Sequence, residues 1–302
     1  MIDGFRIPLG DWAKAFIGWV TDTLGLFFDV IATIFTGFYD GVAWVLTTPP
    51  FWVIILVIVA LSFWAKGWKL ALGAAIGLVV IVGVDQWEKA MQTLALTLVA
   101  AFIAILIAIP VGIWASRSAR VSAVVRPVLD FLQTMPAFVY LIPAIFLFSV
   151  GVVPGIVATI LFAVAPGVRL TELGIRGVDA EVVEAGHAFG ATPGRILRQI
   201  QLPLAMPSIM AGVNQVIMLS LSMVVIASMV GAPGLGKDII QALSRIDIGL
   251  GFEAGLSVVI IAMILDRVTG GFGRARKRPA RPAAQAPAPK AAPAEASAPV
   301  PA

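Results

Sequence analysis

The chain has 302 residues, of which 60% are hydrophobic and 13% are charged, and its mean hydropathy is +0.99. Soluble domains carry roughly 25% charged residues, so this composition excludes a separate soluble domain and predicts a polytopic membrane protein. Cysteine is absent and His187 is the one histidine, which excludes disulfides and makes a metal site built from these residues implausible.

The N-terminal region, residues 1–50, is apolar but carries a stripe of aspartates at spacings of 11, 7 and 11 residues. These are Asp11, Asp22, Asp29 and Asp40. At 100° per residue they fall within about 20° of one another on a helix. A span in lipid would not hold such a stripe, so we expect a broken amphipathic helix on the membrane surface. The alternative is an eighth span whose acidic stripe faces other helices.

Seven apolar runs follow, near residues 51–65, 69–85, 92–115, 127–149, 153–172, 204–231 and 253–272. A helix needs about 20 apolar residues to cross a membrane, and the last five runs meet that length. The first two are shorter and predict an accessory transmembrane hairpin over 51–91. The remaining five predict a core domain over 92–273.

Positively charged residues fall in alternate gaps between these runs. They are Lys66 and Lys69, then Arg117, Arg120 and Arg126, then Arg176, Arg195 and Arg198. Cytoplasmic loops of membrane proteins carry an excess of lysine and arginine. We therefore expect these gaps on the inner side of a bacterial cytoplasmic membrane and, with seven spans, the N-terminus outside.

The C-terminal segment, residues 274–302, accounts for the net charge of +4. Its one acidic residue is Glu295, and its basic residues are Arg274, Arg276, Lys277, Arg278, Arg281 and Lys290. The Ala/Pro repetition of this segment cannot build a core. We expect a disordered cytoplasmic tail beside membrane lipid, and we expect no nucleic-acid partner.

Several polar residues and one proline lie inside the predicted spans, where polar groups are costly and often face a water path. The predicted translocation path consists of Gln133, Thr134, Pro136, Tyr140, Asn214, Ser220 and Ser222. The more common role of such a residue is a hydrogen bond between helices. Arg169 and Glu172 are three residues apart, and we expect them to form a local ion pair near the inner interface.

The segment Gly231–Asp238 is similar to a phosphate-binding loop but places Asp238 where that loop needs Ser or Thr for Mg²⁺. We interpret it as a glycine-rich turn on the outer face, next to a helix that starts at Asp238. No set of nucleophile, base and acid is visible in the sequence. The prediction is a chain with no catalytic residues, no metal and no bound cofactor.

An unusually polar segment lies between the fifth and sixth runs, in a predicted cytoplasmic loop over 173–203. It reads Glu184-Ala185-Gly186, three residues, Gly190, nine residues, then Ile200-Gln201-Leu202-Pro203. This spacing resembles the EAA loop of ABC-importer permeases, E-A-A-x3-G-x9-I-x-L-P, with Gly186 in place of the second alanine. The resemblance implies a helix that docks into a cytoplasmic ATPase. The implied coupling residues are Glu184, Ala185, Gly186, Gly190, Ile200, Leu202 and Pro203.

From about residue 92 to residue 270 the chain resembles the permeases of glycine betaine/proline betaine importers. The segments that carry the resemblance are 127–143, 201–215 and 221–231. It implies an all-α, type I ABC-importer permease fold with about seven transmembrane helices and an N-terminal amphipathic interfacial helix. Residues 92–273 would then be the core permease domain.

The same resemblance implies three protein partners: an ATPase that carries ATP and Mg, an extracytoplasmic substrate-binding protein, and a second permease copy in a homodimer. The expected solute is glycine betaine, proline betaine or a related quaternary ammonium compound. Choline, carnitine or proline is the alternative within the importer class. An ATP-independent channel or carrier would need a charge-lined path but no site for an ATPase.

Overall fold

The computed structural model describes residues 8–272, and the predicted tail over 274–302 lies outside them. All regular elements within the described residues are helical. The elements are α1 Leu9–Thr47, α2 Phe51–Lys66, α3 Trp68–Gly83, α4 Trp87–Arg117, α5 Ala119–Thr134, α6 Ala137–Phe148, α7 Val152–Arg176, α8 Ala180–Ala188, α9 Pro193–Ile196, η1 Leu197–Gln201, α10 Leu202–Ser222, α11 Val224–Ser228, α12 Leu235–Arg245 and α13 Ile248–Phe272.

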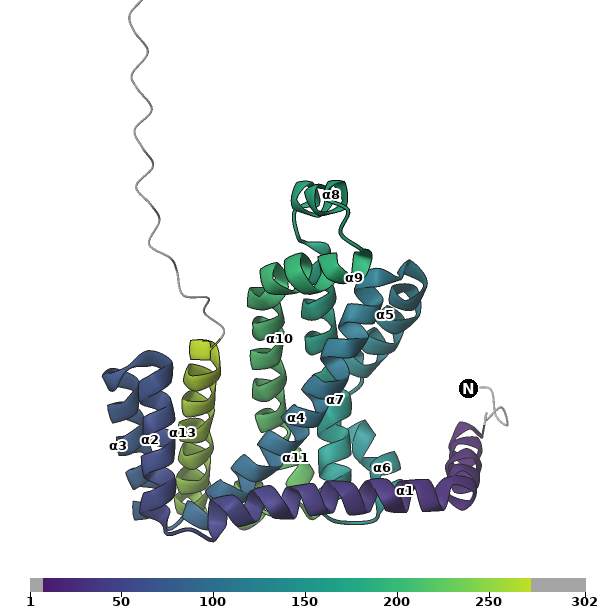
Figure 1. Ribbon diagram of the computed structural model, residues 1–302. Coiled ribbons are helices and arrows are strands. Elements are labelled where there is room, and N and C mark those ends of the chain that lie inside the picture. The colour runs from purple at the N-terminus through teal and green to yellow at the C-terminus, as the bar shows by residue number, and fades with distance from the viewer. Residues whose placement is uncertain (1–7, 273–302) are drawn as a thin grey trace, which may run out of the picture.

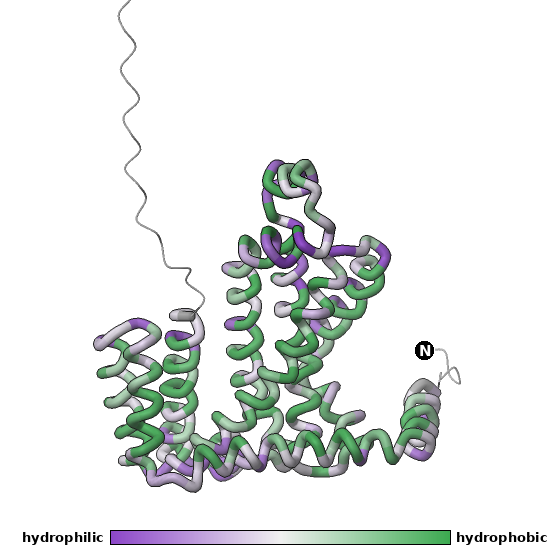
Figure 2. Tube along the Cα trace, viewed as in Figure 1, coloured by the Kyte–Doolittle hydropathy of each residue, from purple (hydrophilic) through white to green (hydrophobic). Residues whose placement is uncertain are grey.

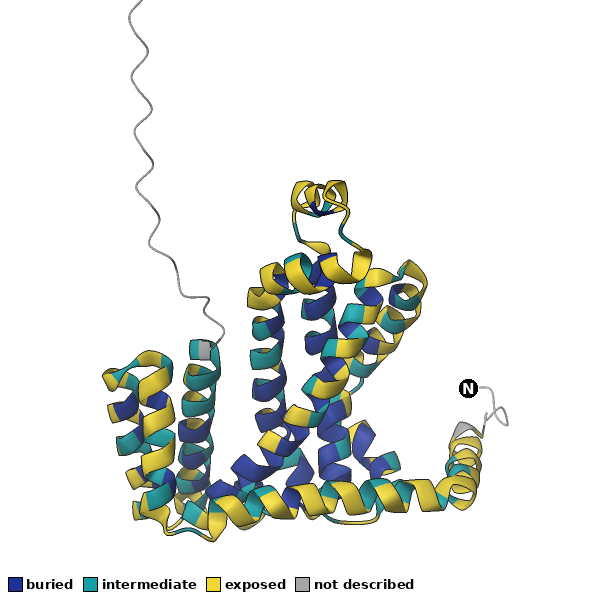
Figure 3. Ribbon diagram, in the orientation of Figure 1, coloured by how far each residue is buried: buried dark blue, intermediate teal, exposed yellow. Residues whose placement is uncertain are grey.

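The centre of the fold is a bundle of α4, α7 and α10, where most of the buried residues lie (Figures 1 and 3). Glycines let these helices cross closely. A Cβ built on Gly167 would lie 2.7 Å from the Cβ of Ala108 on α4 and 2.9 Å from Cγ2 of Val216 on α10. A Cβ on Gly112 would lie 2.6 Å from the Cβ of Thr171. Because dispersion replaces the hydrophobic effect between helices in lipid, such close approach stabilises the bundle.

By length and composition, five of the described helices are apolar enough to cross a membrane, or six if the bent pair of α5 and α6 counts as one span. α2 and α3 are apolar but have 16 residues each. They pack on each other and on α13 as a hairpin beside the bundle (Figure 1). Figure 2 shows mostly apolar residues along the helices of the bundle and the hairpin, and polar residues gathered at the end of the bundle where α8 and α9 lie.

The apolar run over 127–149 is not one straight span. α5 and α6 meet at 101°, with Met135 in an extended conformation between them. Pro136 explains the break, because proline lacks an N–H and disfavours the helical conformation of the residue before it. The hydroxyl of Tyr140 donates to the backbone oxygen of Leu132 and so links the two arms of the bend.

α1 runs across the ends of α4, α6 and α7, at the end of the bundle opposite α8 (Figure 1). The expected break in this helix is present, at Leu24. Ring contacts fasten α1 to the bundle: Phe38 lies 5.6 Å from Phe102, and Phe28 lies 5.5 Å from Phe148, between ring centres. The aspartate stripe is exposed, so within the described residues it faces away from the other helices.

Candidate functional site

The segment with the EAA spacing folds into a short helix that stands beyond the ends of α5, α7 and α10 (Figure 1). This helix, α8, begins after Asp179, whose Oδ1 accepts a hydrogen bond of 3.0 Å from the N–H of Glu181. That bond satisfies one of the amides left free at a helix start. Glu184 and Ala185 on α8 are exposed, so they are available to a partner protein.

The turn that ends α8 favours a glycine. Gly190 has φ of +75°, and its N–H donates to the oxygen of His187 over 2.8 Å. The N–H of Ala191 donates to the oxygen of Gly186 over 3.1 Å. A Cβ at Gly190 would meet nothing within 4 Å. The left-handed backbone, and not crowding within this chain, therefore favours glycine at this position.

Two positions of the EAA spacing are in contact. Gly186 is buried, and a Cβ built on it would lie 2.8 Å from Cδ1 of Ile200 and 3.4 Å from Cγ1 of Ile196. The thirteen residues between Gly186 and Ile200 thus form a closed hairpin, in which α8 packs against α9 and η1. The contact joins α8 to η1, which leads directly into α10.

A π-helical turn, η1, joins α9 to α10. The N–H of Leu202 donates to the oxygen of Leu197, five residues earlier. Pro203 follows at once, and its ring would clash with the carbonyl of Gln199 in a regular α-helix. The wider turn relieves that clash. The helical segment therefore continues without a break from α9 through η1 into α10.

The surface beside α8 has a mixed chemistry. Phe189 is 92% exposed at the end of the helix. Arg117, Arg195 and Arg198 line a neighbouring groove of about 500 Å³. Phe189 was not predicted as a site residue, although a lone aromatic residue in a polar loop is a usable signal. The face combines carboxylate, apolar and guanidinium groups, a combination found at protein–protein interfaces.

Below α8, a buried carboxylate links three helices. Glu172 on α7 is 3% exposed, and its Oε1 accepts from Oγ of Ser122 over 2.7 Å and from Nη2 of Arg126 over 3.0 Å, both on α5. Nε of Arg176 lies 3.0 Å from the same oxygen. Nη2 of Arg176 also donates to the oxygen of Ala115 at the end of α4.

The expected local pair of Arg169 and Glu172 is therefore wrong. Arg169 pairs with Asp130 on α5, and both side chains are substantially exposed. Glu172 instead bonds to Ser122 and Arg126, because α5 places these two residues beside it and their hydrogen bonds satisfy the buried carboxylate. A tertiary contact thus replaces the local one.

The polar residues near the bend of α5 and α6 differ in exposure. Gln133, Thr134 and Pro136 are exposed, and the hydroxyl of Thr134 donates to the oxygen of Phe131. Tyr140 is buried, and its hydroxyl is used within the bend. Gln133 is accordingly the freest of these polar groups to meet a solute.

The polar residues of α10 lie in three different settings. Asn214 donates from Nδ2 to Oδ1 of Asp266 over 3.0 Å and accepts from the hydroxyl of Thr269, both on α13. Ser220 is buried with no hydrogen-bond partner for its hydroxyl, and Ser222 is exposed and bonds to the oxygen of Met218. Asn214 thus makes a helix–helix contact, while Ser222 lies near the cluster that contains Tyr140 and Met223.

The turn with a phosphate-loop spacing lies at the end opposite α8 and leads into α12, which starts at Leu235 rather than at Asp238. Asp238 is buried, ion-paired with Lys89 at 2.5 Å and bonded to Nε2 of Gln86 at 3.0 Å. Its carboxylate ties α12 to the start of α4. Among residues 8–272 no group of three or more metal-ligating side chains is found.

Comparisons with known proteins define the class. The family described as binding-protein-dependent transport system inner membrane component matches residues 104–277. The chain belongs to this family and is a multi-pass membrane component of such a transport system.

Relatives place it more narrowly. It is 48% identical to the glycine betaine transport system permease protein OpuAB of Bacillus subtilis (strain 168), over 87% of this chain and 94% of that protein. It is 44% identical to the glycine betaine/proline betaine transport system permease protein ProW of Escherichia coli (strain K12), over 89% of this chain and 76% of that protein.

The fold matches a solved transporter. The inward-facing methionine ABC transporter MetNI superposes with a TM-score of 0.56 and 23% identity, over 61% of this chain and 92% of the matched chain. This likeness confirms the predicted all-α fold of a type I ABC-importer permease.

Proposed function

We propose that this chain is the transmembrane permease subunit of an ATP-driven importer for glycine betaine or proline betaine. The observation that carries the proposal is α8, a capped helix held by the contact of Gly186 with Ile200 and projecting from one end of the bundle. The solute is inferred from relatives that are 44–48% identical over most of the chain. ATP and Mg would be bound by a separate ATPase on which α8 docks.

The orientation follows from charge. The turn between α2 and α3, the turn between α4 and α5, and the α8 segment lie at the same end of the molecule (Figure 1). These segments carry the basic residues, so we place this end and the C-terminus in the cytoplasm. α1 and α12 then lie on the outer side, where a substrate-binding protein would deliver the solute to a pair of permease copies.

Two connections would carry motion from α8 into the membrane. Through Ile200, α8 is packed on the segment that continues as α10. At its other end, α8 follows α7, whose Glu172 is bonded to α5 and whose Arg176 is bonded to α4. A push on α8 therefore acts on α10 and on the linked ends of α4, α5 and α7 together, which would rock the spans between inward-open and outward-open states.

The test is uptake of radiolabelled glycine betaine by cells that lack their own betaine transporters and produce this chain with its ATPase and binding protein. We expect saturable uptake that unlabelled proline betaine reduces more than choline, carnitine or proline does. An ATPase unable to hydrolyse ATP should abolish uptake. Uptake that persists with the inactive ATPase would favour a channel or carrier instead.

A further inference from the structure

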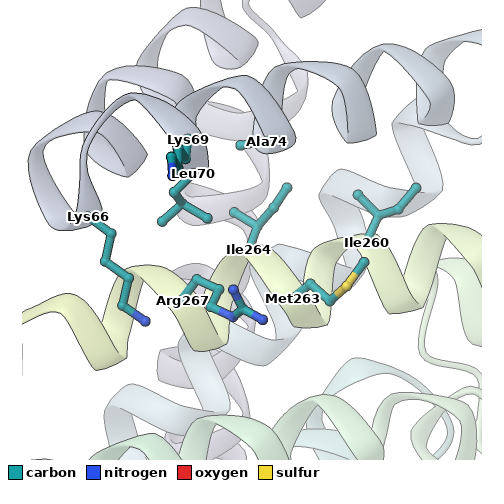
Figure 4. A pocket seen from close by; sticks show the side chains of 9 residues that line it. Lys66, Lys69, Leu70, Ala74, Ile260, Met263, Ile264 and Arg267 are labelled. Atoms are coloured by element: carbon teal, nitrogen blue, oxygen red, sulfur yellow. The ribbon is translucent and has the colours of Figure 1, made fainter.

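A groove of about 380 Å³ lies between the α2–α3 hairpin and α13, at the end of the molecule that carries α8. Its lining is divided by chemistry. Lys66, Lys69 and Arg267 contribute the cationic groups, and Ile260 and Met263 lie on the apolar side. In Figure 4, Lys66 and Arg267 lie at one end of the groove and Ile260 lies at the other.

Among residues 8–272, Lys66 and Lys69 form no ion pair, and Arg267 forms one long ion pair. No acidic side chain lines the groove within the described part of the chain. Nε of Arg267 is 3.8 Å from Oδ2 of its neighbour Asp266, a long ion pair that offsets only part of the charge of the three cations. Lys69 has its Nζ 6.0 Å from the ring centre of Trp68. Three cations that share one groove repel one another, so an anion bound there would be stabilised.

The start of α3 adds to the attraction for an anion. Gly67 is the N-cap residue and offers no side chain to the free amides, and the first turn of α3 holds no acidic residue. The positive end of the helix dipole therefore adds to the charge of Lys69. Trp64 and Trp68 are 77% and 63% exposed at this level, as expected of tryptophans at a membrane–water interface.

The occupant must match both halves of the groove. A small inorganic anion would use the cationic end and leave the apolar wall exposed. We propose that the groove binds a phospholipid with a net anionic headgroup, with the headgroup among Lys66, Lys69 and Arg267 and an acyl chain along Ile260 and Met263. Basic pockets between helices on the cytoplasmic side of a membrane are suited to anionic headgroups.

Binding there would fasten the hairpin to α13. Arg267 is next to Asp266, which is bonded to Asn214 on α10. A lipid that draws Lys66 and Lys69 toward Arg267 would therefore hold the hairpin against the helix that contacts the bundle. This proposal requires a membrane-spanning chain and does not depend on which solute the protein transports.

The test measures lipid retention by the full chain in nanodiscs and then by native mass spectrometry. The probe is phosphatidylglycerol mixed with phosphatidylcholine. The variant Lys66→Gln/Lys69→Gln/Arg267→Gln should bind phosphatidylglycerol about 100-fold more weakly, because each of the three basic residues near an anionic surface contributes a factor of about five. A control with the same charge change, Lys14→Gln/Lys237→Gln/Arg245→Gln, should bind it normally.

A second pair of variants tests the apolar wall without changing charge. Gly73 lines the groove, and a Cβ there would meet nothing within 4 Å, so Gly73→Leu should fill the chain-binding space and still fold. Gly83→Leu, also at an uncrowded glycine of α3, is its control. We expect Gly73→Leu to lower retention and Gly83→Leu to leave it unchanged.

Three results would overturn the proposal. The first is equal phosphatidylglycerol retention by the groove triple variant and its control. The second is displacement of the lipid by millimolar inorganic phosphate, which would indicate a small-anion site. The third is equal retention of phosphatidylcholine, which would remove the requirement for an anionic headgroup.

Discussion

Gly186 lies against Ile200, so that a methyl group added to Gly186 would come within 2.8 Å of Cδ1 of Ile200. Both residues occupy positions of the EAA spacing. The distance between them along the chain is therefore a packing requirement: it lets the hairpin close so that α8 rests on α9 and η1, the segment that leads into α10. The departure from alanine at 186 gives the isoleucine room.

This contact predicts a graded response at Gly186. Gly186→Ala should leave betaine uptake near normal, because the group it meets first is the end of a flexible side chain and alanine favours a helix by about 0.5–1 kcal/mol over glycine. Gly186→Leu should separate α8 from η1 and abolish most uptake. The measurement is betaine uptake by cells that hold equal amounts of each variant in the membrane. Normal transport by Gly186→Leu would contradict the requirement for close packing at this position.

The backbone conformation of Gly190 predicts which side chains this position tolerates. Its φ of +75° lies in the left-handed region, where a β-branched residue carries a strain of about 1–3 kcal/mol. Gly190→Val should therefore lower uptake strongly, while Gly190→Asn should keep most of it, because asparagine tolerates this conformation. Equal loss in the two variants would show instead that the docked partner leaves no space for a side chain.

Removal of the buried carboxylate at Glu172 should destabilise the protein. Glu172→Leu leaves Ser122, Arg126 and Arg176 without their shared acceptor. Because the arginines can still reach water, we expect a loss of about 1–3 kcal/mol, measured as a lower melting temperature in detergent. The control Arg169→Gln breaks an exposed pair with Asp130 and should change stability by less than about 1 kcal/mol.

The structural features that could be predicted from the sequence are local ones. Apolar runs identify spans because each span must bury its own backbone in lipid. The coupling loop stands out because Glu184 and its polar neighbours interrupt those runs. None of these inferences requires knowledge of which helices touch.

The parts that could not be read are the long-range pairings. Glu172 and Arg126 are 46 residues apart in the chain, and Gln86 and Asp238 are 152 apart. With 29 glycines in the sequence, nothing marks Gly112 and Gly167 as the ones at helix crossings. Tyr140 and Asn214 were predicted on a solute path as polar residues in spans, but their partners at Leu132 and Asp266 depend on the bend and on packing.

The orientation can be tested with single cysteines, because the chain has none of its own. Lys237 and Thr192 are both exposed and lie on α12 and beside α9. An impermeant thiol reagent added to intact cells should label Lys237→Cys and should label Thr192→Cys only after permeabilisation. The reverse pattern would place α8 outside and remove the site for a cytoplasmic ATPase.

The most direct test of coupling is substrate-stimulated ATP hydrolysis by the complete transporter reconstituted with Glu184→Lys. Glu184 is exposed on α8, and its side chain forms no hydrogen bond or ion pair within residues 8–272, so the variant should fold and reach the membrane. It should lose stimulation of ATP hydrolysis and solute uptake together, while Lys237→Ala at the opposite end retains both. Normal uptake by Glu184→Lys, with loss of ATP binding in Lys237→Ala, would contradict the assignment of α8 as the coupling helix.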